Sequence, residues 1–540
     1  MQAPRPTNEQ VLDYAPGSPE RLALKARLRE MQSTRIELPL VIDGREVRTG
    51  WLEDAIVPHD HRQVLALAHL ANAAQMGEAI TAAQRAAPDW SRRSWEERAA
   101  VFLRAADIAA GPWRATLNAA TMLGQSKTVH QAEIDSAAEL VDFWRFNVDF
   151  MLRIYADQPV SSAGVWNRVD YRPLEGFVYA ATPFNFTAIA GNLPSAPALM
   201  GNTVVWKPSA AAKFSAHFVM EVLRLAGLPP GVINLVYGDA RDISNVAFES
   251  SSLGGVHFTG STEVFRQILK KVNAEPTRYR TYPRIVGETG GKNFVLAHSS
   301  CELEALAAAV IRGGFEYQGQ KCSAASRVFV PEPLWPALKE RLCDEMATIR
   351  VGDVADFGNF MGAVIDEKAW NRHAGAIAKA RAGTGGRLLA GGGADKALGY
   401  FIHPTLVEAD DIRSSFLTEE FFGPIVSVHV YPERGFEALL QVVDETSAYG
   451  LTGSIFAQDR KAIDTASDRL RNAAGNFYIN DKPTGAVVGQ QPFGGARFSG
   501  TNDKAGSMWN LIRWVSPRTI KETFVPPRDY RYRHLASDPA

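Results

Sequence analysis

Between Phe177 and about Gly290, short apolar runs alternate with amphipathic helical patterns, and this rhythm constrains the fold more than any other feature. The run NTVVWKPS leads into AHFVMEVLRLAGLPPG, VINLVYG follows, and GGVHFTG opens onto STEVFRQILKKV. Strands that alternate with helices form a parallel sheet with helices on its faces. The sequence therefore predicts an α/β protein, with a second α/β lobe from about Gly291 to about Asn480.

The rest of the chain carries weaker patterns. At 540 residues it exceeds what one compact core can serve, so two or three lobes are expected. The first 60 residues are mixed and loop-like, and a long helix is predicted over residues 130–155. Alternating Val, Trp and Tyr over residues 158–180 predict a β-hairpin.

Charge and composition argue against several classes of partner. The 58 basic and 59 acidic residues give a net charge of −1, which leaves no electrostatic footprint for nucleic acid. The charge-free stretch from Phe177 to Trp206 is interrupted by prolines and glycines, which predicts a buried core segment rather than a membrane span. Three widely spaced cysteines form neither a disulfide framework nor a metal-ligand pattern. Together with an N-terminus that lacks a signal-peptide pattern, they favour the cytoplasm.

One cysteine stands in unusual surroundings. The stretch YQGQKCSAASR sets Lys321 directly before Cys322 and surrounds both with small and polar residues. A cysteine that only fills a core has apolar neighbours, whereas a nearby cation favours a nucleophilic thiolate. Taken alone, the pattern fits either role.

Three further stretches are candidates for nucleotide contact. In VHFTGSTEV a strand ends and a helix begins near Gly260 and Ser261, and the free N–H groups of a helix start can hold a pyrophosphate. The G-x-G-x-x-G fingerprint is absent, however, and most turns of this kind bind nothing. Lys207 ends the strand VVWK, where ligands of open α/β sheets bind, although a surface lysine is the simpler interpretation. In EEFFGPI, Glu420 and Phe422 suit contact with a ribose and a nicotinamide, and equally suit a solvated charge before a buried aromatic.

The order of the motifs carries more information than any one of them. TPFNFT, FTGST, GETGGKN and GQKCSA are followed by EEFFGPI and PFGGARFSG. This series, within residues 35–525, resembles the aldehyde dehydrogenase superfamily. Within it, ETGGKN, GQKCSA and KPTGAVVGQQPFGGARFSGTNDKAG look most like the delta-1-pyrroline-5-carboxylate dehydrogenases, whose substrate is glutamate γ-semialdehyde.

The resemblance implies an architecture: a Rossmann-type cofactor domain, an α/β catalytic domain and a small β oligomerisation flap. The expected bounds are 35–157 and 175–290 for the NAD-binding domain, 158–174 and 508–526 for the flap, 291–482 for the catalytic domain, and 483–507 for a return segment with a substrate anchor loop. A homo-oligomer, most simply a dimer, is implied as well. Proline oxidation would have to come from a separate proline dehydrogenase, because the chain has no room for that domain.

The resemblance also implies three catalytic roles. Cys322 attacks the aldehyde carbon, the Asn185 amide and the Cys322 N–H stabilise the oxyanion, and Glu288 activates water to hydrolyse the thioester. The family motif ELGGK reads ETGGK here, so Thr289 replaces leucine while the base remains. Singly, each residue has an ordinary structural explanation, whereas the correct order of all three favours catalysis.

NAD is the implied cofactor. Its expected contacts come from Thr182, Lys207, Gly260, Ser261, Glu420 and Phe422. Many NAD-preferring relatives have glutamate three residues after the lysine, where this chain has Ala210. Because a carboxylate there would repel a 2′-phosphate, its absence leaves NADP open as a second, less favoured cofactor.

Substrate contacts are implied in the same way. Ser323 and the N–H groups of Gly485 and Ala486 are expected to bind the substrate carboxylate, and Glu139 is expected to face the ammonium group. The rings of Phe186 and Phe493 are expected to flank the aliphatic carbons, and Lys321 is the neighbouring cation. Two alternatives stay open: a dehydrogenase of another small semialdehyde, such as succinate semialdehyde, and a non-catalytic binding protein of the same fold.

Overall fold

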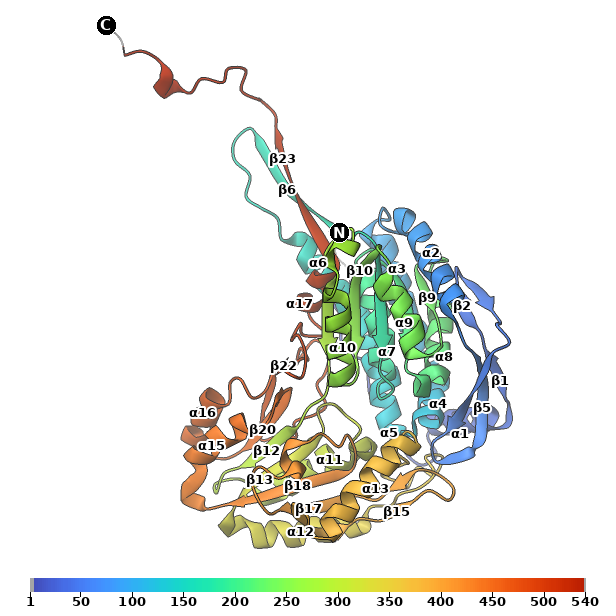
Figure 1. Ribbon diagram of the computed structural model, residues 1–540, viewed down its shortest axis with the longest axis vertical. Coiled ribbons are helices and arrows are strands. Elements are labelled where there is room, and N and C mark those ends of the chain that lie inside the picture. Colours follow the sequence, from blue (N-terminus) through green and yellow to red (C-terminus); the bar gives the residue numbers. More distant parts are fainter. Residues whose placement is uncertain (1–3, 539–540) are drawn as a thin grey trace.

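Two seven-stranded sheets with covering helices form the body of the protein in the computed structural model, which describes residues 4–538 (Figure 1). Each sheet has its own buried apolar residues: one large cluster surrounds the first sheet, and three smaller clusters surround the second. The α/β fold predicted from the sequence is confirmed.

The first sheet has the strand order β11-β10-β7-β8-β9-β2-β3, and the five strands from β11 to β9 are parallel. The strands are β11 (Arg284–Glu288), β10 (Leu253–Thr259), β7 (Phe177–Thr182), β8 (Thr203–Pro208), β9 (Ile233–Leu235), β2 (Leu40–Ile42) and β3 (Arg45–Val47). From β7 the chain adds β8 and β9 on one side, then β10 and β11 on the other. This reversal is a topological switch point, where open α/β sheets bind ligands beyond the carboxyl ends of their strands.

Helices cover both faces of this sheet (Figure 1). They include α2 (Ala73–Trp90), α3 (Trp95–Ala110), α4 (Arg114–Gln125), α7 (Thr187–Leu199), α8 (Lys213–Leu225), α9 (Ala240–Glu249) and α10 (Thr262–Asn273). The charge-free stretch comprises β7, α7 and β8, which are almost entirely buried, so the expected core segment is confirmed. Within residues 4–538, no helix is long and apolar enough to cross a membrane.

The long helix predicted over residues 130–155 is present with one irregularity. α5 (Val129–Ala132), the π-helix η1 (Glu133–Glu139) and α6 (Leu140–Ala156) follow one another without a break. π-helical turns are rare and occur mostly at functional sites. This one ends at Glu139, the residue expected to face the substrate ammonium group.

The second sheet has the order β14-β17-β18-β13-β12-β20-β21 and is parallel except for β14 at its edge. Its strands are β14 (Gly386–Gly391), β17 (Thr405–Ala409), β18 (Ile425–Tyr431), β13 (Ala325–Pro331), β12 (Asn293–Ala297), β20 (Thr452–Phe456) and β21 (Asn476–Ile479). Its helices include α11 (Leu303–Phe315), α12 (Trp335–Thr348), α13 (Glu367–Arg381), α15 (Phe436–Glu445) and α16 (Arg460–Arg469). Neighbouring residues of β12 belong to different apolar clusters: Val295 lies in one cluster and Phe294 lies in another. The reason is that successive side chains of a strand point to opposite faces of the sheet.

Two predictions for less regular segments need correction. Residues 4–18 form no helix or strand, as predicted, but residues 19–60 are not loop-like: they include α1 (Pro19–Ser33), β1 (Ile36–Leu38) and β4 (Leu52–Val57) besides β2 and β3, and β5 (Asp60–His69) joins β1 and β4 in a small sheet. Residues 158–180 form no hairpin, because β6 (Val165–Pro173) pairs antiparallel with β23 (Val515–Thr523). This β6–β23 ribbon projects from the body of the molecule (Figure 1).

Candidate active site

The predicted site residues lie where the carboxyl edge of the first sheet meets the amino edge of the second. Glu288 is the last residue of β11, and β12 begins at Asn293. Cys322 lies just before β13, and its carbonyl oxygen accepts a hydrogen bond from Asn293 Nδ2 at 2.7 Å. The junction therefore brings the expected base and the expected nucleophile to one place.

A strained turn presents Cys322. Tyr317, Gln318 and Gly319 have φ values of 51°, 56° and 63°. A Cβ on Gly319 would lie 2.4 Å from the Gly423 carbonyl oxygen, so a side chain does not fit there. Burial, together with the carboxylates of Glu288 and Glu420, raises the pKa of the Cys322 thiol to about 12, while the Ser323 N–H opposes this rise. The unliganded protein thus holds the thiol in its protonated form.

Asn185 lies in the segment that enters α7. Its side chain is buried, and Nδ2 donates a hydrogen bond to the Gln320 carbonyl oxygen at 3.0 Å. The Asp135 carboxylate accepts from the N–H groups of Thr187 at 2.9 Å and Ala188 at 2.8 Å, which fixes the first turn of the helix. The expected oxyanion donor is thereby attached to the loop that carries the cysteine.

Glu288 is placed as a buried carboxylate. Burial raises its pKa well above the ordinary value, while the charge of Lys504 and the Gly495 N–H oppose that rise. Its Oε2 atom is buried and accepts no hydrogen bond from residues 4–538. A Cβ on Gly494 would lie 2.8 Å from Oε1, so the glycine leaves room for the carboxylate. A carboxyl group with a raised pKa and one free oxygen suits a general base.

Four of the expected cofactor residues lie along the carboxyl edge beside the switch point. Thr182 ends β7, and its Oγ1 accepts from Trp206 Nε1 at 3.0 Å. Lys207 is near the end of β8, and burial lowers its pKa to about 8. Gly260 follows β10, and Ser261 caps α10, its Oγ accepting from the Val264 N–H at 3.3 Å. A lysine and a helix N-terminus on one sheet edge suit an anionic dinucleotide.

The other two cofactor residues come from the second lobe. Glu420 Oε1 accepts from the Gly291 N–H at 2.7 Å, and burial raises the pKa of Glu420. Phe422 has a φ of 54°, and its ring lies edge-on to Phe184 with centroids 5.8 Å apart. Residues from both lobes therefore border the switch point.

The expected carboxylate anchors form one cluster. Ser323 follows the cysteine, and its Oγ lies 2.7 Å from Thr484 Oγ1. Gly485 comes next with a φ of 93°, and neither its N–H nor that of Ala486 donates a hydrogen bond among residues 4–538. Two unpartnered N–H groups beside a hydroxyl pair suit a carboxylate ligand.

The expected ammonium partner and the two expected flanking rings come from three different segments of the chain. Glu139 is half-buried, and burial raises its pKa to about 8, Asp135 adding to the rise and Lys127 opposing it. Phe186 precedes α7, and Lys127 Nζ lies 4.2 Å from its ring centroid. Phe493 pairs through its backbone with Ala505 and adjoins Gly494, which faces Glu288.

Lys321 departs from expectation. Its ammonium group is buried and pairs with Glu316 at 3.2 Å, and its charge also acts on Glu139. The cationic neighbour predicted to favour the Cys322 thiolate does not do so, because the thiol pKa is raised and carboxylates, not Lys321, supply the charges that act on it. Sequence adjacency misled here, since adjacent side chains at a tight turn can point apart.

Comparison with known proteins identifies the family of the chain. The model of the aldehyde dehydrogenase family matches residues 51–520. The chain belongs to this family. A delta-1-pyrroline-5-carboxylate dehydrogenase of Agaricus bisporus is 50% identical over 532 residues, which cover 98% of this chain and 97% of that one. The mitochondrial protein of that name from Homo sapiens is 47% identical over 529 residues, covering 98% and 94%. The crystal structure of the Mycobacterium tuberculosis Delta-pyrroline-5-carboxylate dehydrogenase bound with NAD has a TM-score of 0.96 and 53% identity, covering 99% of each chain.

Four residues that organise this aldehyde dehydrogenase site escaped the sequence prediction: Lys127, Asp135, Thr484 and Lys504. Lys127 and Asp135 form a buried ion pair of 2.6 Å directly behind Phe186 and the start of α7. In a sequence, a charge within a polar stretch such as GQSKTVHQ resembles a solvated loop residue, and no motif distinguishes it. Only the folded structure reveals the burial.

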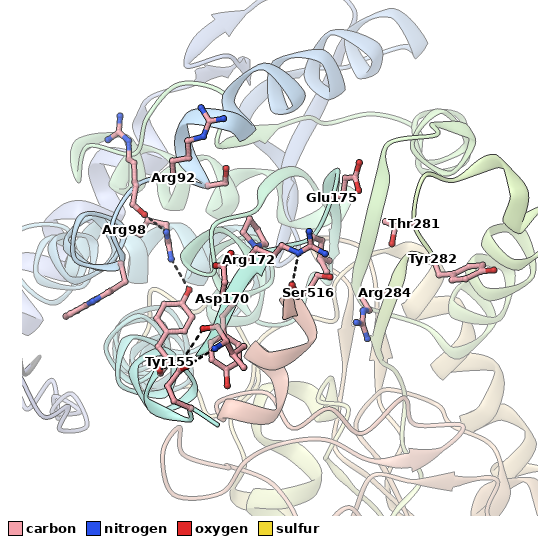
Figure 2. Close-up of a pocket in the computed structure, with 18 residues that line it drawn as sticks. Arg92, Arg98, Tyr155, Asp170, Arg172, Glu175, Thr281, Tyr282, Arg284 and Ser516 are labelled. Atoms are coloured by element: carbon pink, nitrogen blue, oxygen red, sulfur yellow. Dashed lines mark hydrogen bonds between the residues drawn. The ribbon is translucent and has the colours of Figure 1, made fainter. Parts of the chain in front are cut away.

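A separate cavity of about 760 Å³ lies at the base of the β6–β23 ribbon. Arg98, Arg172 and Arg284 line it (Figure 2). Arg98 Nη2 donates to the Tyr155 hydroxyl at 2.9 Å, and Arg172 Nε donates to the Ser516 carbonyl oxygen at 3.0 Å. None of the predicted catalytic, cofactor or substrate residues lines this cavity, so it is separate from the expected site.

Proposed function

We propose that the protein oxidises L-glutamate γ-semialdehyde, the open form of delta-1-pyrroline-5-carboxylate, to L-glutamate with NAD in proline catabolism. The observation that carries this proposal is the pair of recognition elements beside the Cys322 loop. Ser323, Thr484 and the free N–H groups after it suit the substrate carboxylate. Glu139, whose charge acts on Lys321 in the same loop, suits the ammonium group.

The three expected catalytic residues account for both halves of the reaction. The Cys322 thiolate adds to the aldehyde carbon, and the Asn185 amide and a backbone N–H hold the resulting oxyanion. When bound, NAD accepts the hydride that leaves this carbon, and a thioester remains on Cys322. Glu288 then takes a proton from water as the water attacks the thioester carbonyl, which releases the carboxylate product and the thiolate.

The cofactor-binding residues fit NAD better than NADP. Ser261 at the N-terminus of α10 suits the pyrophosphate, while Lys207 and Glu420 suit the two riboses. Although Ala210 supplies no carboxylate, the charges of Asp239 and Glu53 act on Lys207 against that of Lys213, which pairs with Glu53, and we expect the two carboxylates to repel a nearby 2′-phosphate. Glu53→Gln should therefore raise the NADP rate relative to the NAD rate; an unchanged ratio would reject this role for Glu53.

The direct test is the rate of NADH formation with delta-1-pyrroline-5-carboxylate, succinate semialdehyde and propanal at equal concentration. Preference for the first supports the proposal. Equal rates, or preference for succinate semialdehyde, would reject the substrate and leave aldehyde oxidation standing. Failure with every aldehyde would favour a non-catalytic binding protein.

We propose the domain division expected from the family, with the NAD-binding domain at 35–157 and 175–290, the flap at 158–174 and 508–526, the catalytic domain at 291–482 and the return segment at 483–507. The projecting β6–β23 ribbon supports a flap through which two copies associate as a homodimer. Trp166 on this ribbon is 49% exposed. Light scattering of wild type and Trp166→Asp tests this, and an unchanged dimer, or a wild-type monomer, would oppose it.

We further propose a cytoplasmic protein that receives its substrate from a separate proline dehydrogenase. The three cysteines are free, which suits a reducing compartment. The human relative bears a mitochondrial name, so fractionation of the source cells has to decide the compartment. Co-purification of proline-oxidising activity tests the partner.

A further inference from the structure

A segment of the N-terminus, residues 8–14, lies against the helix that carries Glu139. Asn8 Nδ2 donates to Asp142 Oδ2 at 2.7 Å and to the Val488 carbonyl oxygen at 2.8 Å. In return, Asn8 Oδ1 accepts from Gln490 Nε2 at 2.9 Å. One side chain thus joins α6 to the loop around Val488 and Gln490, two segments that are far apart in the sequence.

The residues joined by Asn8 belong to the two elements that are proposed to recognise the substrate. Asp142 follows Glu139 by three residues on the continuous η1–α6 helix, which is about one helical turn. Val488 and Gln490 lie in the same short loop as Gly485 and Ala486, with their free N–H groups. Asn8 therefore connects the ammonium partner to the carboxylate anchor.

The loop packs against α6 through Gly489, which adjoins the Phe146 ring, and through the buried Val488, and Asn8 adds polar contacts to this packing. Gly485 and Gly489 have positive φ values of 93° and 82°, so the loop contains two conformationally permissive residues. Its own hydrogen bonds include the Gln490 and Gln491 N–H groups donating to the Val487 carbonyl. The Val488 carbonyl is instead held by Asn8.

Asn8 is itself rigidly placed. The Glu9 N–H donates to Asp142 Oδ1 at 2.7 Å, and the Glu9 carboxylate pairs with Arg114 and Arg145, each at 2.7 Å. Farther along, the Leu12 N–H and the Tyr14 hydroxyl both donate at 2.8 Å to the fully buried Glu133. Because the segment is fixed at several buried contacts, it can hold the helix of Glu139 and the loop of Gly485 and Ala486 at a constant distance.

We infer that Asn8 is a positioning residue for the substrate: it fixes the spacing between Glu139 and the loop of Gly485 and Ala486. This inference rests on the proposed function. The bond to Asp142 is charge-assisted, and charge-assisted bonds are among the stronger hydrogen bonds in proteins. Loss of the Asn8 side chain should loosen the loop of Gly485 and Ala486. The site should then bind the carboxylate and the ammonium group of glutamate semialdehyde less well at the same time. An aldehyde that has neither a carboxylate nor an ammonium group does not depend on this spacing.

Steady-state kinetics of Asn8→Ala tests the inference. We expect the KM for glutamate semialdehyde to rise about tenfold, the effect of losing roughly one hydrogen bond to a charged group, while kcat changes less than about twofold. The KM for NAD and the kinetics with propanal should not change. Gln490→Ala, which removes only the contact from the loop, should shift the same KM in the same direction by a smaller factor. Arg21→Ala is the matched control, because Arg21 Nη1 contacts the Tyr14 carbonyl at 2.9 Å, away from the loop.

Hydrogen exchange supplies a second readout that needs no substrate. Asn8→Ala should speed amide exchange within residues 484–491 and leave α10 unchanged, whereas Arg21→Ala should do neither. Unchanged exchange and unchanged KM, or an equal rise in KM for propanal, would overturn the inference. If the wild type does not prefer glutamate semialdehyde to propanal, the proposed function fails instead, and the exchange experiment still decides whether Asn8 holds the loop. Should Asn8→Ala not fold, Gln490→Ala decides both measurements.

Discussion

Asn185 Nδ2 donates a hydrogen bond to the carbonyl oxygen of Gln320, two residues before the expected nucleophile. A side-chain amide carries two N–H donors, so one ties Asn185 to the nucleophile loop and the second remains for an oxyanion. Because Asp135 holds the first N–H groups of α7, the donor and the nucleophile keep one fixed relation. Such preorganisation is what makes an oxyanion donor effective.

Asn185→Ala should therefore lower the rate of hydride transfer by about 10²–10³-fold, the usual cost of one oxyanion donor. Asn185→Asp should lose at least as much, because a carboxylate of the same shape repels the oxyanion. Single-turnover NADH formation with saturating aldehyde measures this step. Retention of the burst rate within about tenfold in both variants would show that Asn185 is not the donor.

The charge of Lys504 lowers the pKa of Glu288, the expected general base. Burial raises the pKa of Glu288, and the ammonium of Lys504 acts against that rise, while the lysine itself is held by the neutral Gly475 and Gly494 carbonyls, each at 2.8 Å. Removing the cation in Lys504→Met should raise the pKa of Glu288 further. Since only the ionised carboxylate accepts a proton, activity at low pH should fall and the acid limb of the kcat–pH profile should move to higher pH.

Lys504→Arg keeps the charge and serves as the matched control. Its acid limb should stay close to that of the wild type, whereas the methionine variant shifts. The acid limb reports the ionisation of Glu288 only where thioester hydrolysis limits turnover. In that case Lys504→Met should form NADH in a rapid first burst, followed by a slow steady-state rate. An acid limb at the same pH in all three proteins would exclude Lys504 from this role.

The raised pKa of Cys322, about 12, predicts slow alkylation of the unliganded enzyme. The rate with iodoacetamide should rise about tenfold per pH unit above neutrality without reaching a plateau, because only the thiolate reacts. Glu288→Gln should speed alkylation, since it removes a carboxylate that opposes ionisation. Cys322→Ala should abolish oxidation and report the background from Cys301 and Cys343. A plateau near neutral pH would contradict the protonated thiol.

The sequence predicted those parts of the fold that are specified locally. The strands and helices between Phe177 and Gly290 have clear periods, and the motifs fall at their ends, so the sheet and the family were both accessible. The alternation of residues did not reveal which distant strands pair, because it indicates a strand without indicating its partner: β6 pairs with β23, where Val165 faces Thr523, and only the family resemblance placed these two segments in one unit. The short strands β1 to β3 are too brief for any period to be visible.

Family motifs supplied the candidate site residues, whereas buried charges near them could not be predicted from the sequence. Lys127, Asp135 and Lys504 look like ordinary surface charges in the sequence, and their roles arise from packing between distant segments. Lys321 shows the converse, because its place beside Cys322 suggested an electrostatic partner, yet its side chain turns to Glu316. Orientation at a tight turn depends on backbone dihedral angles that a residue list does not contain.

The contact between Ser323 and Thr484 yields the last prediction. Their hydroxyl oxygens lie 2.7 Å apart, so Thr484 orients the Ser323 hydroxyl next to the two free N–H groups of the anchor loop. Ser323→Ala should raise the KM for glutamate semialdehyde about tenfold with little change in kcat, because the hydroxyl is expected to bind the far carboxylate and not the reacting carbon. Thr484→Val should raise the KM by a smaller factor, since the serine remains but loses its partner. Propanal kinetics separates binding from chemistry: if Ser323→Ala lowers kcat for propanal as well, the serine acts on Cys322 itself and the anchor assignment is wrong.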